Sequence, residues 1–270
     1  MKTILVLTDI FNYRNPYLID FLALRWKKRG YKVFKHYSTK NLPDADIAIL
    51  HIDATIVSGK YTQCLSRYPV VLNRNVLNIS KTVFSDNIVK SDDDYSGPVI
   101  IKTNANCGGR PEATKIRYIW SKLTLQWRWE KVNTLDPQKY PVLENKKNIP
   151  AGVWGNKNLV VEKFLPERTN GLYFLRYWIF LGNKGWAGRF GASDPIVKFN
   201  NMTTKDEMIP VPDELKIWRK KLGFDYGRFD YVEHNGKPVL FDVNKTLGGV
   251  HHIETYSAKL DFLASGINDF

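Results

Sequence analysis

A late segment of the sequence gathers three side chains that could hold a metal ion. Two β-rich runs flank the dipeptide Asn235-Gly236, which is typical of a tight hairpin turn. Asp242 and Asn244 are two residues apart and project from one face of the second run, and pairing across the hairpin can bring Asp230 beside them. Because carboxylate and amide oxygens suit Mg²⁺, the pattern predicts a magnesium site.

The same hairpin carries a cation and also has a simpler interpretation. Arg228 lies two residues before Asp230 and shares its face. The alternative is a surface hairpin with scattered acids and one arginine. Asp242 and Asn244 interrupt an otherwise apolar run, where unpaired polar groups are costly to bury. Spacing alone leaves both interpretations open.

A second candidate is a lysine at the end of an apolar strand. Residues 98–101 lead into Lys102, and a turn containing Gly108 and Gly109 follows. A lysine in that place can point at phosphate oxygens, and the glycines let backbone N–H groups approach them. An ordinary strand exit with a solvated lysine is the alternative.

The third candidate is a strand that ends at a proline bend. Residues 158–164 are β-rich, and Pro166 follows them. Such a bend offers backbone donors and acceptors to a flat base, and Glu167 just beyond it could take ribose hydroxyls. The alternative is a strand end with a charged rim.

The first 70 residues alternate between strand and helix signals. Apolar or β-rich runs occur at 4–7, 31–37, 47–52 and 70–72, and a helical pattern covers 16–29. The alternation predicts a small, mostly parallel α/β lobe. Two further regions follow, with a helix predicted over 80–89 and strands over 98–102, 158–164, 173–180 and the two arms of the hairpin.

Length and composition bound the class of protein. The chain has 270 residues, 43% of them hydrophobic, and no run near the roughly 20 apolar residues that span a bilayer. Residues 1–9 already include an acidic residue, Asp9, and are expected to form a core strand, not a signal peptide. The two cysteines, Cys64 and Cys107, lack metal-ligand spacing and suit a reducing compartment. We expect a cytoplasmic protein with no membrane partner.

The formal net charge of +13 indicates an anionic partner. Basic residues are spread along the chain, so a generic basic surface explains the charge as well as a nucleic-acid footprint does. Trp120, Trp127 and Trp129 could stack on bases, which keeps a nucleic-acid-binding module among the alternatives. A nucleic acid is nevertheless not the expected partner.

Taken in order, these motifs resemble the ATP-grasp superfamily, in particular its D-alanine–D-alanine ligase type. That family shows a strand lysine before a glycine turn, a Glu-Lys-aromatic-Leu hinge, a Gly-Arg-x-Asp strand and a Glu-x-Asn strand. Here the counterparts are Lys102, residues 162–165, residues 227–230 and residues 242–244. The resemblance runs from about Asn73 to Gly249. The whole chain is also similar to uncharacterised bacterial ATP-grasp proteins with HxD, GPVIIKT and DVNKT segments, which stand here at 51–53, 97–103 and 242–246.

The resemblance implies an α/β (α+β) fold with a nucleotide cleft. The expected organisation is a pre-ATP-grasp α/β domain at 1–72, a small ATP-grasp lobe with the phosphate lysine at 73–157, and a C-terminal ATP-grasp lobe with the metal site at 158–270.

The resemblance also implies roles for individual residues. Lys102 and Lys81 would hold phosphates, Glu162, Lys163 and Leu165 would frame adenine, Glu167 would bind ribose, Arg176 would contact phosphate, and Asp230, Asp242 and Asn244 would hold Mg²⁺. Arg228 would face the oxyanion of a tetrahedral intermediate, and Arg189, Lys245 and His251 would contact the substrate.

Two departures from the family pattern concern the metal and the acceptor. The usual second-metal Glu is Asp242 here, which leaves one or two metal ions open. After Asn244, the common Ser/Thr-Pro-Gly is replaced by residues 245–249, Lys-Thr-Leu-Gly-Gly.

The implied activity is that of an ATP- and Mg²⁺-dependent ligase. It would activate a carboxylate as an acyl phosphate for attack by an amine or another nucleophile, forming a C–N bond. The expected substrate is a small anionic molecule, and the oligomeric state is left open, a homodimer included. The alternatives are an ATP-grasp kinase acting on a small molecule and a non-catalytic nucleotide- or nucleic-acid-binding module.

Overall fold

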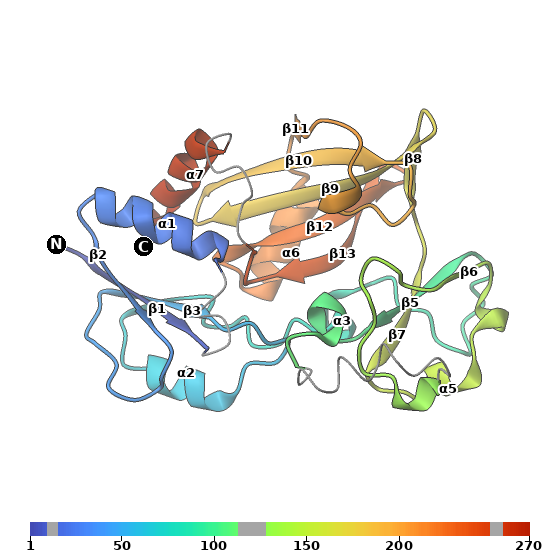
Figure 1. The fold of residues 1–270 in the computed structure, drawn as a ribbon, viewed down its shortest axis with the longest axis horizontal. Helices are drawn as coiled ribbons and strands as arrows, with labels where there is room; N and C mark the ends of the chain where they lie inside the picture. The colour runs from blue at the N-terminus through green and yellow to red at the C-terminus, as the bar shows by residue number, and fades with distance from the viewer. Residues whose placement is uncertain (10–15, 113–127, 249–255) are drawn as a thin grey trace.

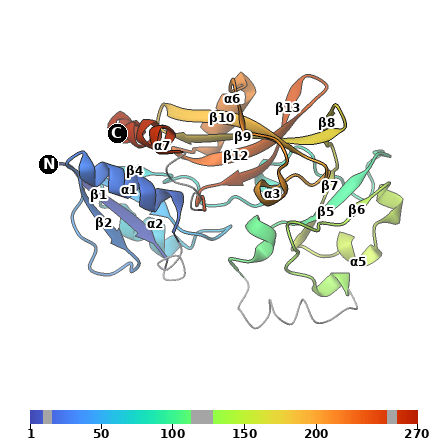
Figure 2. The ribbon, with the colours of Figure 1, turned by 45° about the horizontal axis from the view of Figure 1, so that its top comes forward.

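The computed structural model describes residues 1–9, 16–112, 128–248 and 256–270. In these ranges the strands form three separate sheets (Figure 1). Figure 2 shows the N-terminal sheet with α1 and α2 at one end of the molecule and the middle sheet at the other. No helix in the described ranges is long and apolar enough to cross a membrane.

The N-terminal sheet is parallel, as the sequence predicts. Its order is β2-β1-β3-β4, formed by Thr3–Thr8 (β1), Lys32–His36 (β2), Ile47–His51 (β3) and Val70–Leu72 (β4). The helices are Leu18–Lys28 (α1) and Gly59–Leu65 (α2). Gly30, with φ of 89°, follows the end of α1 in the left-handed region and lets the chain turn back into β2.

The middle sheet is small and antiparallel. Its order is β6-β5-β7, formed by Val99–Thr103 (β5), Val142–Leu143 (β6) and Leu159–Lys163 (β7). The short helix Ala151–Trp154 (α5) precedes β7, and the single turn Lys81–Phe84 (α3) lies before β5. The strand β7 pairs with β5, although it falls in the range assigned to the C-terminal lobe from the sequence. The domain boundaries themselves stay predictions.

The C-terminal sheet is the largest of the three and is also antiparallel. Its order is β11-β10-β9-β12-β13, with β8 paired to β9. The strands are Glu167–Thr169 (β8), Leu172–Leu181 (β9), Lys184–Ala192 (β10), Glu207–Ile209 (β11), Tyr226–His234 (β12) and Lys237–Asn244 (β13), and the helices are Asp213–Leu222 (α6) and Ser257–Ala264 (α7). The predicted hairpin at Asn235-Gly236 is confirmed, and both turn residues have the positive φ that such a turn requires.

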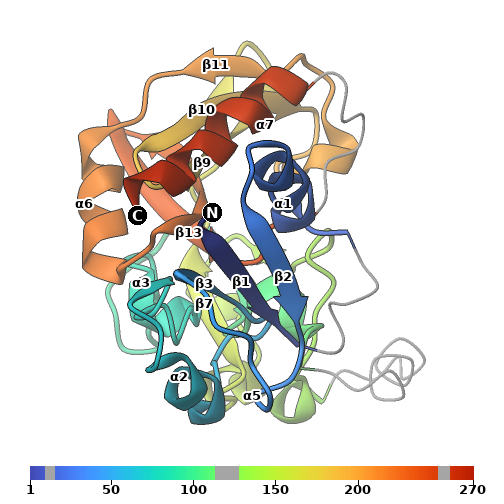
Figure 3. The same cartoon turned by 90° about the vertical axis from the view of Figure 1, so that its left-hand side faces the viewer.

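The N- and C-terminal sheets share one core. The helix α7 lies beside α1 (Figure 3), where Trp26 donates its indole N–H to the carbonyl of Ala264 at 2.8 Å and Arg25 pairs with Asp261 at 3.0 Å. Buried side chains of β1 and α1 belong to the same apolar cluster as those of β9, β10 and α7. The last helix therefore fastens the C-terminal sheet to the N-terminal lobe.

The helix predicted over 80–89 is wrong beyond its first turn. The α3 helix ends at Phe84, and Ser85 is extended. Tertiary pairing with β7 overrides the local pattern, because Val89 N–H donates to the carbonyl of Val161 and Lys163 N–H donates to that of Asn87.

Asn73 joins the end of the N-terminal sheet to the start of β12. This fully buried side chain accepts N–H bonds from Asp225 (2.9 Å) and Tyr226 (3.1 Å) and donates to the carbonyl of Tyr226 at 2.8 Å. Its own N–H donates to the carboxylate of Asp225 at 2.7 Å. Because Asn73 has φ of 58°, it also supplies a left-handed bend that asparagine tolerates better than most residues.

We expect Asn73→Ala to lower the free energy of unfolding by about 2–4 kcal/mol, because it leaves buried backbone groups unpaired. The matched control is Asn170→Ala, at an exposed position with φ of 50°. The control should cost only about 1 kcal/mol of backbone strain. Urea denaturation of both variants measures the difference, and equal losses would contradict a special role for the Asn73 side chain.

His51 is a buried neutral histidine at the end of β3. It is 1% exposed, and neither ring nitrogen has a hydrogen-bond partner in the described part of the chain. Its ring packs edge-on against Tyr17, with centroids 5.3 Å apart. Burial lowers the pKa of His51 to about 4, with Lys35 and Lys245 acting in the same direction and Asp20 against it.

This burial makes stability depend on pH below neutrality. Between about pH 6.5 and 4, His51 is protonated in the unfolded chain and neutral in the folded chain. The free energy of unfolding therefore falls as pH falls through this range. Each unit in that window should cost about 1.4 kcal/mol of unfolding free energy. Denaturant titrations at several pH values should show a shallower loss in His51→Gln, and identical slopes would refute the assignment.

Candidate functional site

A cavity of about 480 Å³ lies where the middle sheet, α3 and the β12–β13 hairpin meet. Its lining comes from α3 (Lys81), the segment after it (Asn87), β5 (Ile100, Lys102), the following turn (Asn106, Cys107, Arg110), Pro137, Gln138 and Tyr140, β7 and its exit (162–166), β9 (Phe174, Leu175), residues 195–200, and the hairpin (Val232, Val239, Phe241, Asp242, Asn244). No residue of the N-terminal sheet is among these described lining residues.

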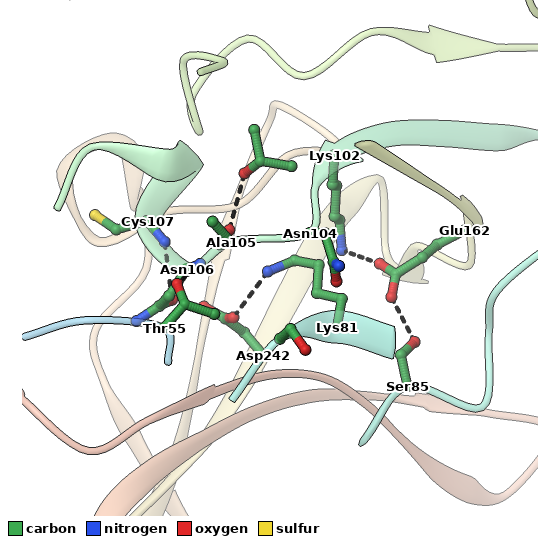
Figure 4. A network of polar contacts seen from close by, with 12 residues as sticks. Thr55, Lys81, Ser85, Lys102, Asn104, Ala105, Asn106, Cys107, Glu162 and Asp242 are labelled. Atoms are coloured by element: carbon green, nitrogen blue, oxygen red, sulfur yellow. Dashed lines mark hydrogen bonds and ion pairs between the residues drawn. The ribbon is translucent and has the colours of Figure 1, made fainter. Parts of the chain in front are cut away.

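The strand lysine Lys102 is held by a buried carboxylate. Glu162 lies opposite Ile100 in the β5–β7 register, two residues from Lys102, so both side chains leave the sheet on the same face. The ammonium of Lys102 is 2.7 Å from Glu162, which also accepts the hydroxyl of Ser85 (Figure 4). Glu162 is 1% exposed, so Lys102 has a fixed position at the cavity wall.

Lys81 reaches the cavity from α3 and contacts the hairpin. Its ammonium is 3.3 Å from the carboxylate of Asp242, and its side chain is almost fully buried (Figure 4). Burial alone would lower the pKa of Lys81, but Asp242, Tyr140 and Glu162 together outweigh burial and raise that pKa above its ordinary value. Lys81 and Lys102 thus share one wall of the cavity.

The hairpin register brings the three predicted metal ligands together. Asp230 lies directly opposite Asp242, and Arg228 lies opposite Asn244. Asp242 and Asn244 line the cavity, whereas Asp230 and Arg228 stand behind them and are not among the lining residues. Burial and the neighbouring Asp242 raise the pKa of Asp230, against the effect of Arg228 at 2.6 Å.

A β-bulge in β13 sets this arrangement. Tyr231 pairs with Leu240 and Asp230 with Asp242, so Phe241 is the extra residue. Phe241 and Asp242 consequently both face the cavity, and the ring of Phe241 lies 4.9 Å from the ammonium of Lys102.

Asn244 is oriented by a link to the N-terminal sheet. Its side-chain oxygen accepts the N–H of Thr246 at 2.8 Å, and the Thr246 hydroxyl donates to Asp53 at 2.9 Å. The other oxygen of Asp53 accepts the hydroxyl of Tyr17 at 2.9 Å. The HxD and DVNKT segments, nearly 200 residues apart, are therefore in contact.

Sequence reasoning missed Lys198 as a cavity residue. It lines the cavity from the segment after β10, and burial lowers its pKa although Asp242 and Asp230 act against this. The lysines at 102 and 81 act in the same direction as burial. The signal that could have found it is a lysine inside the otherwise apolar run Ile196–Phe199.

Another part of the cavity lining is apolar. It includes Phe164, Leu165 and Pro166 at the exit of β7, with Ile196 and Val197 from the segment after β10. Lys163 also lines the cavity, and its ammonium lies 5.2 Å from the ring of Tyr95. An apolar slot beside a strand exit suits a flat ring system.

Glu167 and Arg176 are not brought to the cavity, because they are paired with each other. The guanidinium of Arg176 contacts both carboxylate oxygens of Glu167, the nearest at 2.8 Å, and also pairs with Glu233 at 3.0 Å. Glu167 further accepts the N–H of Glu233. In this structure both side chains stabilise the β8–β9–β12 junction, and their contacts with ribose and phosphate stay predictions.

The predicted substrate residues are also away from the cavity or outside the described ranges. Arg189 pairs with Glu207 across β10 and β11 at 2.7 Å. Lys245 is fully buried, donates to the carbonyl of Val76 at 3.3 Å, and has its pKa lowered by burial to about 8. His251 lies outside the described residues, as do Trp120 and Trp127.

The glycine turn after β5 serves backbone packing. Gly108 has φ of 68°, and a Cβ there would collide with the carbonyl oxygen of Leu135, whose N–H donates to Gly108. Gly109 approaches the carbonyl of Asn133 in the same way. The glycines thus let the segment before residues 137–140 dock beside the cavity. The expected approach of their N–H groups to phosphates stays a prediction.

The donor set fits a divalent cation bound together with a polyanion. In the described ranges no group of three or more His, Cys, Asp or Glu side chains is arranged to hold a metal ion. Asp242, Asn244 and Asp230 supply two carboxylates and an amide, which suit a hard cation that takes its remaining ligands from phosphates and water. Three lysines at 81, 102 and 198 supply the charge that phosphates need.

Comparison with known proteins gives matches in structure only. No protein-family model matches the chain, and no curated protein matches it.

Solved structures match nearly the whole chain at low identity. The macrocyclase MdnC bound with precursor peptide MdnA from Microcystis aeruginosa is 10% identical, with a TM-score of 0.57 over 98% of this chain and 99% of that one. A RiPP-associated ATP-grasp ligase from Chryseobacterium gregarium, in complex with ADP and a leader and core peptide, is 11% identical, with a TM-score of 0.54 over 98% and 97%. The D-alanine–D-alanine ligase from Bacillus anthracis complexed with ATP is 15% identical, with a TM-score of 0.53 over 99% and 98%.

These matches agree with the motif order read from the sequence and with the three-sheet architecture. At such identities they establish the fold and not the substrate. The chain has the ATP-grasp fold.

Proposed function

We propose that this protein is an ATP- and Mg²⁺-dependent ligase that activates a carboxylate as an acyl phosphate for attack by an amine or another nucleophile. The observation that carries the proposal is one cavity whose lining includes both the lysines Lys81 and Lys102 and the oxygen ligands of Asp242 and Asn244. The ATP-grasp fold supports it, since similar structures include a ligase complexed with ATP.

The cavity has a suitable part for each portion of a nucleotide. The apolar lining around Phe164 and Leu165 would hold the base against the exit of β7. Lys81, Lys102 and Lys198 would hold the phosphates, because ammonium groups in a partly desolvated cavity attract them strongly.

Mg²⁺ would be held by Asp242 and Asn244, with Asp230 directly behind Asp242. When bound, the ion would neutralise phosphate charge and favour phosphoryl transfer. Arg228 would favour the ionised form of Asp230 and hold it in place, since their 2.6 Å contact and the Tyr177 ring 4.9 Å away fix the guanidinium. Its predicted contact with an oxyanion would require it to leave that position.

In the proposed reaction a carboxylate oxygen of the substrate attacks the γ-phosphorus of ATP, and ADP leaves. The lysines stabilise the charge that develops on the transferred group and on ADP. The amine then attacks the acyl carbon, a C–N bond forms, and phosphate leaves while the amine loses a proton. The net charge of +13 and the cationic cavity support a small anionic substrate, and we propose that the protein works in the cytoplasm.

Hydroxylamine trapping should distinguish this ligase from a kinase. With ATP, Mg²⁺ and a screen of amino acids and small acids, we expect ADP release together with a hydroxamate, because hydroxylamine captures an acyl phosphate. Mass spectrometry of the products provides the second measurement. A stable phosphorylated product without hydroxamate would instead establish a kinase.

Substitution of the cavity residues tests the site itself. Asp242→Ala and Lys102→Ala should each lower ADP release by about 100-fold or more while the chain remains folded. Lys157→Ala, at an exposed position outside the cavity, is the matched control. Full activity in both cavity variants would show that the site lies elsewhere.

A further inference from the structure

Each of the two carboxylates predicted to bind Mg²⁺ forms an ion pair with a cationic side chain in this structure. Arg228 pairs with Asp230 at 2.6 Å, and Lys81 pairs with Asp242 at 3.3 Å. Both cationic side chains are charged at neutral pH. Each of the two facing carboxylates therefore has a positive charge beside it that offsets the repulsion between them. The two pairs differ in how firmly the cation is held.

The Arg228 pair is part of the C-terminal sheet. Both residues lie on β12, two positions apart, and the guanidinium also lies 4.9 Å from the ring of Tyr177. Neither Arg228 nor Asp230 is among the residues that line the cavity. Nothing that enters the cavity would need to displace this pair.

The Lys81 pair crosses the cavity wall between distant segments. Lys81 begins α3, Asp242 lies on β13, and both line the cavity. Figure 4 shows the ammonium of Lys81 directed at Asp242, whose side chain is 30% exposed. Their contact, at 3.3 Å, is longer than the 2.6 Å contact of the arginine pair. An incoming ligand therefore has direct access to this ion pair.

The cavity as it stands repels a free divalent cation. Six cationic side chains contribute, namely five that line the cavity, at 81, 102, 110, 163 and 198, and the neighbouring Arg228, against the three carboxylates of Glu162, Asp230 and Asp242. The ammonium of Lys81 also takes an oxygen of Asp242 that a metal would need. A polyanion reverses both effects, because phosphates can take the ammonium and leave the carboxylate free.

We propose that Lys81 is an internal counter-ion of the cation site: it occupies Asp242 until nucleotide phosphates draw its ammonium away, so that nucleotide and divalent cation enter the cavity together. This inference rests on the proposed function and adds to it a coupling between the binding of nucleotide and of the divalent cation. The protein alone binds the cation weakly, and each ligand increases affinity for the other.

The test measures Mn²⁺ binding to the nucleotide-free full chain by loss of the free-ion EPR signal. The parent should bind Mn²⁺ weakly. Lys81→Met, which keeps the volume and removes the charge, should bind it about tenfold more tightly or better, because Asp242 is released. Lys163→Met is the matched control, since it removes a cavity lysine that has no contact with Asp242, and it should gain clearly less.

Equal Mn²⁺ affinities in Lys81→Met and Lys163→Met would overturn the counter-ion role. Lys81→Gln provides a second variant, and failure of both to fold would also overturn it, because the pair would then be structural. Calorimetry of the parent with Mg²⁺ and a non-hydrolysable ATP analogue separates the two hypotheses. Analogue binding with unchanged Mn²⁺ affinity in Lys81→Met defeats only this inference, whereas no analogue binding defeats the proposed function.

Discussion

The register of the β12–β13 hairpin is the constraint on which the candidate site depends. From the Asn235-Gly236 turn, a regular ladder would place Asp242 opposite Phe229, whose side chain is fully buried in the core. The bulge at Phe241 shifts the ladder by one residue and turns Asp242 to the cavity, opposite Asp230. The extra residue Phe241 thus determines whether the carboxylate of Asp242 points to the core or to the cavity.

Burial of charged side chains around the cavity lowers the stability of the fold, and ion pairs offset part of that loss. Desolvation of Glu162, Asp230 and the facing lysines is unfavourable, and ion pairs of this kind contribute little net stability even when well formed. A wall with only a structural role would avoid this desolvation cost if it consisted of apolar side chains. Retention of two carboxylates and four lysines in the lining of one 480 Å³ cavity is therefore better explained by a ligand that needs both charges.

Local patterns in the sequence predicted the parallel N-terminal sheet, the hairpin and the order of the motifs, because each depends on residues close together in the chain. Lys81 and Lys102 could be placed near Asp242 only through the resemblance, which carries tertiary information. The pairing of Glu167 with Arg176, the bulge and the cavity position of Lys198 depend on contacts between separate strands. The prediction of a helix over 80–89 was wrong for the same reason, because backbone groups of that segment form hydrogen bonds with β7.

The N-terminal sheet takes part in the site without lining it. Asn73 fixes the start of β12 through Asp225 and Tyr226, and Asp53 fixes the chain just beyond β13 through Thr246. These are the two ends of the hairpin that lie together, at the Arg228–Asn244 pair, whereas the turn at the other end is exposed. The end that carries the predicted ligands is thus held from two positions by the lobe that precedes it. Since Thr246 donates to both Asp53 and Asn244, a loosened N-terminal lobe would displace Asn244.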